Sequence, residues 1–244
     1  MNMNVRIKCQ NCAVRTSGLC SNISEQAAND LSRSVHRRRM PAGQVLYGGN
    51  AKMGTYAVIV SGVVKLVHAR ADGRNQIVGL QFPADFVGRP YADEANLVAE
   101  AATDLELCSF SCRVYETLTE MHPEVERAVL KRALSDLDSA REWMFMLGRK
   151  TASERVATLL LLFAERMGGE VRERYPETGE IKRVAFEMPL SRTDFAACLG
   201  LRLETVSRQI SALKAEGIVA AAKTRAFEVC DMKALRHLSE TAVE

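Results

Sequence analysis

Length, composition and charge set broad limits on this chain of 244 residues, a length that predicts one large domain or two modest ones. Hydrophobic residues make up 47% of it and aromatic residues only 6%, so we expect mainly aliphatic cores. The formal net charge of +3 is too small to indicate a nucleic-acid partner by itself. Neither a run of roughly 18 apolar residues that would span a membrane nor a signal peptide is visible. We therefore expect a cytoplasmic protein with no membrane partner.

The sequence has seven cysteines, an odd number that does not suit a disulfide framework in a reducing compartment. Three of them, Cys9, Cys12 and Cys20, lie close together in a polar stretch at the start of the chain. Clustered thiols in such a protein indicate metal or redox chemistry. Residues 1–22 are therefore predicted to form a cysteine-rich arm, and a short helix is predicted around residues 24–34.

The sequence pattern changes between residues 40 and 107, where glycines recur and apolar residues come in short, valine-rich runs. Tyr56, Val58 and Val60 alternate with their neighbours along one of these runs, as in a β-strand. An Asp-Gly pair at residues 72–73 lies between two further runs and predicts a hairpin. Several short strands at this spacing predict a β-roll or β-sandwich.

From Pro123 the apolar residues recur at helical spacing, which predicts one helix of about 25 residues. Charged residues occupy its other faces, so the apolar residues form a narrow seam. Such a seam favours pairing with a second copy of the chain, although it could instead pack on the β domain of its own chain. The seam, and with it the predicted dimer interface, consists of Val125, Val129, Ala133, Leu137, Ala140, Met144 and Leu147.

A second helical block is predicted over residues 151–167 and is expected to end at Gly168 and Gly169. Residues 171–187 are predicted to form a polar loop or a ribbon. A pair of short helices follows. Ser191 is placed as the N-cap of the first helix, with Asp194 at the capping-box position.

The spacing of Ala196, Gly200 and Val206 is typical of a helix-turn-helix. A small residue lets the helices approach, the glycine takes the left-handed conformation of a sharp turn, and the valine fills the angle between the helices. We predict the second helix over residues 203–216. Two short strands, residues 217–219 and 226–229, would make this a winged variant. An ordinary helix pair with a solvated charged face is the alternative.

The start of that second helix carries polar side chains suited to a major groove. Arginine can bond guanine, glutamate can accept from the cytosine amino group, and hydroxyls can contact bases or phosphates. Lys214, Lys223 and Arg225 suit phosphate contacts. The predicted DNA-reading residues are Arg202, Glu204, Thr205, Ser207, Arg208 and Gln209.

The stretch from Leu199 to Arg208 resembles the recognition-helix motif of the CRP/FNR family of transcription regulators. The resemblance implies an α+β fold with a cyclic-nucleotide-binding-like β-roll over residues 23–121, a dimerisation helix over 122–149 and a winged helix-turn-helix over 150–244. It also implies a homodimer that reads a TTGA-type inverted repeat in double-stranded DNA. Glu204, Ser207 and Arg208 match the base-contacting residues of the FNR-type branch.

Three clustered thiolates need a fourth ligand to complete a four-cysteine iron–sulfur or zinc site. The candidates are Cys108, Cys112, Cys198 and Cys230, of which the last two are expected to be small buried side chains. FNR-type oxygen sensors, including their FixK-, FnrN- and FnrL-like members, hold a 4Fe–4S cluster with three N-terminal cysteines and one in the β domain.

The residues around Cys108 resemble the stretch that carries the β-domain ligand in those sensors. The resemblance therefore implies Cys9, Cys12, Cys20 and Cys108 as the ligands. Cys112 is the alternative fourth ligand, because both could lie on one loop after a strand over residues 103–107.

These features together lead to a hypothesis of oxygen-controlled transcription. The cluster would tie a disordered N-terminal arm to the β domain and favour dimerisation through the seam. Two recognition helices would then reach major grooves about 34 Å apart. By family analogy, residues 70–75 and 85–91 would contact RNA polymerase. The sequence does not identify the target genes, and it does not distinguish activation from repression at a given promoter.

Other functions are less consistent with these residues. In cyclic-nucleotide sensors an Arg-Ser pair grips the phosphate, whereas here Arg89 is followed by Pro90. Sensing of nitric oxide by haem would leave the three clustered cysteines unexplained. The four histidines are scattered, with no ligand spacing and no phosphate loop or nucleophile elbow nearby, so an enzyme is not expected.

Overall fold

The computed structural model describes residues 9–48, 54–69, 75–91, 97–175, 179–221 and 225–240. Contacts divide the chain into two compact units, residues 1–141 and 142–244. Helix α3 (Pro123–Arg149) is 27 residues long and contributes to both units, as predicted for the long helix. Within the described residues, no helix is long and apolar enough to cross a membrane.

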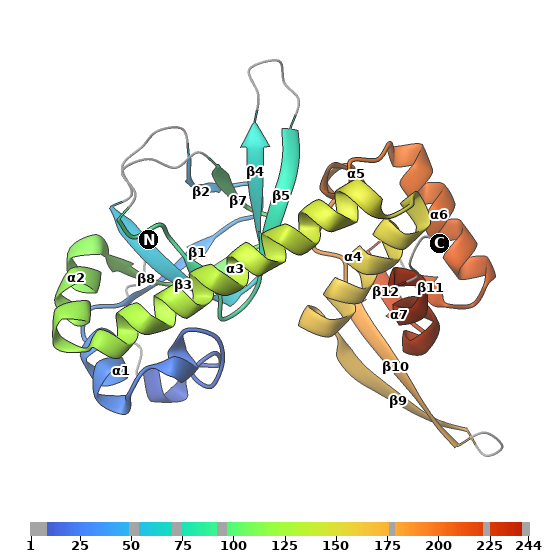
Figure 1. Ribbon diagram of the computed structural model, residues 1–244. Helices are drawn as coiled ribbons and strands as arrows, with labels where there is room; N and C mark the ends of the chain where they lie inside the picture. Colours follow the sequence, from blue (N-terminus) through green and yellow to red (C-terminus); the bar gives the residue numbers. More distant parts are fainter. Residues whose placement is uncertain are drawn as a thin grey trace. The chain divides into compact units, whose positions relative to one another are not determined.

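The first unit is built on two four-stranded antiparallel sheets, with strand orders β1-β8-β3-β6 and β2-β7-β4-β5 (Figure 1). They enclose an aliphatic core that includes Met40, Ile59 and Leu107, and together they form the predicted β-roll. The strands are β1 (His36–Met40), β2 (Val45–Tyr47), β3 (Thr55–Ser61), β4 (Val64–Ala69), β5 (Asn75–Gln81), β6 (Phe86–Val87), β7 (Val98–Ala101) and β8 (Leu105–Ser111).

Strand β3 is buried on both faces, which explains why every residue from Tyr56 to Val60 is apolar. Ala57 and Ile59 point into the core between the sheets, whereas Tyr56, Val58 and Val60 point to the outer face. That outer face is covered by the N-terminal arm, by helices α1 and α2, and by the first turns of α3. The covering elements are η1 (Cys9–Asn11), η2 (Cys20–Asn22), α1 (Glu25–Ser32) and α2 (Cys112–Met121).

The predicted hairpin around residues 72–73 is confirmed in its strands. β4 and β5 pair antiparallel up to Ala69 and Asn75, which lie opposite each other. The Asp-Gly turn itself lies outside the described residues.

The second unit packs helices against a four-stranded sheet of order β11-β12-β10-β9 (Figure 1). Residues 171–187 were predicted as a loop or a ribbon. Residues 171–175 and 179–187 lie in the antiparallel pair β9 and β10, so the ribbon is confirmed for the described part of this segment. The elements are α4 (Ala152–Met167), β9 (Gly169–Tyr175), β10 (Gly179–Glu187), α5 (Arg192–Leu199), α6 (Leu203–Ala215), β11 (Val219–Ala221), β12 (Ala226–Val229) and α7 (Met232–Glu240).

Helix α4 organises this unit. Thr151 and Glu154 form a reciprocal capping box at its start, and Gly168 ends it as predicted. A Cβ at Gly168 would lie 2.1 Å from the Val184 side chain, so the close approach of β10 requires glycine there. Buried Leu159, Leu160 and Phe163 form the α4 side of the core.

Candidate functional sites

The cysteine arm is anchored by three apolar side chains. Val14, Leu19 and Ile23 are buried in the core on the outer face of β3. Residues 9–22 also contain two 3-10 turns, η1 and η2. The expectation of a disordered arm is therefore wrong for this part of the chain. These three apolar residues are the sequence signal for this packing. They did not lead to a prediction because they do not form a continuous apolar run.

Glycine at position 18 brings the arm against the loop before β6. Gly18 has a φ of +54°, and a Cβ there would lie 2.2 Å from the carbonyl oxygen of Ala84. Both the backbone conformation and the close approach therefore favour glycine. The arm is seated on this loop as well as on the core.

The four predicted ligands, Cys9, Cys12, Cys20 and Cys108, lie together. All four are half-buried and pack against the same core. Burial and the neighbouring thiols of the arm raise the pKa of Cys108 to about 12, and burial followed by Cys12 and Cys9 raises the pKa of Cys20 to about 11. Protons therefore stay on these thiols at neutral pH unless a metal centre replaces them.

Two arginines face this cysteine group and were not identified from the sequence. Arg37 lies in β1, pairs with Glu106 at 2.9 Å, and donates from Nη2 to Sγ of Cys12 at 3.8 Å. Arg15 donates to the carbonyl oxygens of Cys20 and Ile23. Positive charge and N–H donors beside the sulfurs suit a centre that carries several thiolates.

The two candidates for the fourth ligand do not lie on the loop that was expected to carry them. Cys108 lies inside β8, opposite Arg37 on β1 and Val58 on β3, and Cys112 is the first residue of α2. Neither cysteine is on a loop, because β8 continues four residues beyond the predicted end of the strand. Burial and a hydrogen bond to Cys112 raise the pKa of Tyr56, so Cys112 has a partner of its own.

The remaining cysteines belong to the second unit, where Cys198 is fully buried in α5. Within the described ranges, no three His, Cys, Asp or Glu side chains lie close enough to hold a single metal ion. The four cysteines of the arm and β8 form an all-thiol donor set, which is the chemistry that holds an iron–sulfur cluster.

The exposed face of α3 differs from the predicted seam. Val125 is 2% exposed and Val129 is half-buried, and both pack in the core beside the cysteines, so they are not available to a partner. The large apolar residues of α3 that are exposed in the first unit are Leu130, Leu134 and Leu137, of which only Leu137 belongs to the predicted seam. The first two were missed because the seam was counted from Val125. Of the other predicted residues, Ala133, Ala140 and Met144 are exposed and Leu147 is half-buried.

The helix-turn-helix is formed by α5 and α6. The Ser191 side chain accepts a hydrogen bond from the backbone N–H of Asp194, which confirms the N-cap. Gly200 is left-handed, with φ of +60°. Arg155, missed in the sequence, holds this region by donating to the carbonyl oxygens of Leu147, Lys150 and Leu199.

Helix α6 buries Val206, Ile210 and Leu213 and turns its polar residues outward. Arg202, Glu204 and Arg208 are exposed, and Thr205, Ser207 and Gln209 are half-buried. Arg202 occupies the N-cap without a side-chain cap, which leaves the first N–H groups of the helix available to an anion.

The wing strands β11 and β12 pair as predicted. Of the basic residues proposed for phosphate contacts, Lys214 and Arg225 are exposed, and Lys223 lies outside the described residues.

Comparisons with known proteins agree with both units. Residues 37–122 match the cyclic nucleotide-binding domain and residues 154–238 match the Crp-like helix-turn-helix domain. A probable transcriptional activator of Rhizobium leguminosarum bv. viciae is 40% identical over 232 residues, 95% of this chain and 93% of that protein. The transcriptional activator FnrL of Cereibacter sphaeroides is 38% identical over 229 residues, 93% and 90% of the two chains. The structure of FixK2 from Bradyrhizobium japonicum matches with a TM-score of 0.74 at 28% identity, covering 86% of this chain and 99% of that one.

Proposed function

This chain belongs to the CRP/FNR family of DNA-binding transcription regulators, and we propose that its DNA binding is switched by oxygen through a 4Fe–4S cluster on Cys9, Cys12, Cys20 and Cys108. One observation carries the proposal: the arm brings three cysteines against a fourth that lies in the β-roll some ninety positions later. Besides burial, all three arm cysteines raise the pKa of Cys108, so they lie near it. This supports Cys108, rather than Cys112, as the fourth ligand.

A bound cluster would supply a centre that dioxygen oxidises and dismantles. The protein's own residues position and support it. Val14, Leu19 and Ile23 seat the arm, and the Arg37–Glu106 pair aims an N–H donor at the sulfur of Cys12. N–H donors beside the ligand sulfurs tune the stability and potential of a cluster. Loss of the cluster would leave free thiols, and the raised pKa values of Cys9, Cys20 and Cys108 would return these three to the protonated form.

The arm is linked to α3 by two routes. In the first, Val125, Ala128 and Val129 pack in the same core as the cysteines, and Ser24 donates to Glu124 at 2.8 Å. A shift of the arm therefore acts directly on the first two turns of the helix.

The second route passes through the loop before β6. Gly18 touches Ala84, and the next residue, Asp85, is only 2% exposed and forms an ion pair with Arg132 of α3. Arg132 also pairs with Asp136 one turn later. The Asp85 carboxylate also accepts from the backbone N–H of Phe82 at 2.9 Å. Separating a buried carboxylate from its ion-pair partner is costly, so this loop and α3 move together.

Dimerisation is the step that these contacts would control. Two copies of the chain meet through the stripe Leu130, Leu134 and Leu137, and the pair of α6 helices reads the two halves of a TTGA-type palindrome. Glu204, Ser207 and Arg208 contact bases, and Lys214 and Arg225 contact phosphates. The homodimer then contacts RNA polymerase. Within residues 85–91 only Arg89 and Tyr91 are exposed, so the contact surface of this loop is smaller than predicted.

The test is anaerobic DNA binding to such a palindrome, by fluorescence anisotropy, before and after exposure to air. We expect binding that air abolishes, that Cys12→Ser abolishes, and that Cys112→Ser leaves intact. Iron and acid-labile sulfide are measured on the same samples. Zinc without iron or sulfide after anaerobic purification, or DNA binding indifferent to air and to Cys12→Ser, would overturn the sensor and leave the DNA-binding regulator standing.

A further inference from the structure

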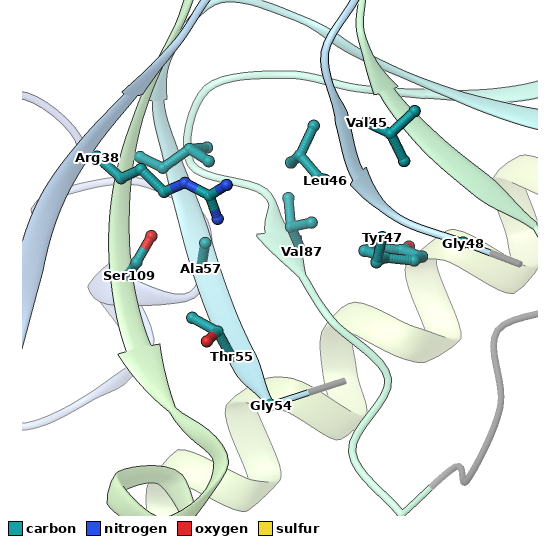
Figure 2. Close-up of a pocket in the computed structure, with 11 residues that line it drawn as sticks. Arg38, Val45, Leu46, Tyr47, Gly48, Gly54, Thr55, Ala57, Val87 and Ser109 are labelled. Carbon is teal, nitrogen blue, oxygen red and sulfur yellow. The ribbon is translucent and has the colours of Figure 1, made fainter. Parts of the chain in front are cut away.

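The open end of the β-roll contains a pocket of about 250 Å³ that the cluster and the DNA-reading helix do not use (Figure 2). At about 30 Å³ per water molecule it has room for on the order of eight waters, which suits a small molecule. The residues that line it are Arg38, Val45, Leu46, Tyr47, Gly48, Gly54, Thr55, Ala57, Val87, Leu107 and Ser109.

The pocket has an apolar side and a polar side. Figure 2 shows Leu46 of β2 pointing toward the sheet that carries Arg38 and Ser109, whereas the neighbouring Val45 points away from it. Arg38 lies opposite Leu107 in the β1–β8 register, so its side chain shares the inward face of the sheet with that core residue. Arg38 is an exposed residue, so it places a positive charge at the solvent-facing side of the pocket. No acidic residue is among the described residues that line the pocket.

Ser109 gives independent support for a polar ligand. It is 7% exposed, and its Oγ is among the buried side-chain atoms of the described residues that have no hydrogen-bond partner. Such atoms are rare in native proteins because the lost hydration is not recovered. The hydroxyl lines the same pocket as Arg38. An oxygen acceptor held there would satisfy both groups.

We propose that this pocket binds a small monocarboxylate with a short hydrocarbon or single-ring tail. Arg38 binds the carboxylate, Ser109 donates to it, and Leu46, Val87 and Leu107 enclose the tail. A single cation and largely apolar walls favour one negative charge on a mostly apolar molecule. The site differs from the loop that grips the phosphate in cyclic-nucleotide sensors, because of residues 83–91 only Val87 lines it.

The experiment is isothermal titration calorimetry of the full chain with hexanoate and with benzoate, each compared with its uncharged amide. We expect the acids to bind and the amides to bind at least tenfold more weakly. Arg38→Gln should weaken acid binding about ten- to hundredfold, which is the effect of one charge-assisted contact. Arg39→Gln, the next arginine along β1 and on its opposite face, is the matched control and should leave binding unchanged.

Ser109→Ala should also weaken the acids, and it should leave the thermal unfolding midpoint unchanged or higher because the buried hydroxyl had no partner. Absence of binding by either acid, equal binding of acid and amide, or equal effects of Arg38→Gln and Arg39→Gln would each overturn the proposal. Tighter binding of cyclic AMP than of the acids would overturn it too. The measurement needs neither cluster nor DNA, so its outcome is independent of the oxygen switch.

Discussion

Replacement of Gly18 by alanine tests whether the seat of the cysteine arm holds the cluster. The change introduces two costs. A residue with φ of +54° and a side chain is strained by about 1–2 kcal/mol, and the new Cβ would lie 2.2 Å from the Ala84 carbonyl oxygen, so the arm or the loop must move. Gly43→Ala is the matched control, since Gly43 also has a positive φ, +82°, but a Cβ there meets nothing within 4 Å.

Both variants should lose about 1–2 kcal/mol of unfolding free energy from backbone strain alone. Only Gly18→Ala should also shorten the lifetime of the reconstituted cluster in air and weaken anaerobic DNA binding. The assays are urea denaturation of each protein, decay of the visible absorbance of the cluster after air is admitted, and anisotropy with the palindrome. Equal cluster lifetimes in the two variants would refute the role given to the contact between the arm and the loop.

Four further predictions concern the loop before β6 and helices α3 and α6. Asp85→Asn leaves Arg132 with only its ion pair to Asp136 and should lower the free energy of unfolding by about 3–5 kcal/mol, measured by urea denaturation. A loss under about 1 kcal/mol would show that the pair is not a rigid link. Leu134→Glu should abolish the anaerobic dimer in analytical ultracentrifugation while leaving the monomer folded, and a persisting dimer would place the interface elsewhere. Arg208→Ala should cost about 1–3 kcal/mol on the palindrome and little on unrelated DNA. Lys214→Ala should instead weaken both DNAs alike and lower the salt dependence.

The helix-turn-helix could be predicted closely because its signals are local. The cap at Ser191 and the turn at Gly200 each need a particular residue at one position, and Val206 belongs to a pattern of three buried residues at helical spacing. The contacts that hold the helix-turn-helix from distant parts of the sequence could not be predicted. Arg155 reaches the turn from α4, and its three carbonyl acceptors come from segments up to 44 positions away.

The cysteine group shows the same division between local and long-range information. Its members could be named from their clustering and from a resemblance, but their setting could not be derived. The alternating pattern of residues 103–107 predicted a strand that ended before Cys108. In the structure Ser109 is inward-facing and nearly buried, and the strand continues to Ser111. The arginine beside Cys12 comes from β1, and only sheet pairing between β1 and β8 brings it there.

The exposed stripe on α3 is short enough to make the dimer marginal. Leu130, Leu134 and Leu137 are 59%, 55% and 46% exposed, so covering each gains roughly half of the 1.5–3 kcal/mol of a fully buried leucine. Six side chains from two copies then contribute on the order of 6 kcal/mol, against a cost of association of about 4–15 kcal/mol. Each change of about 1.4 kcal/mol alters the dimer dissociation constant tenfold. Under the proposed oxygen switch, a shift at the Gly18–Ala84 contact or the Asp85–Arg132 pair would need only this energy to move the chain between monomer and dimer. A centre in the arm would then control DNA binding without rebuilding the interface.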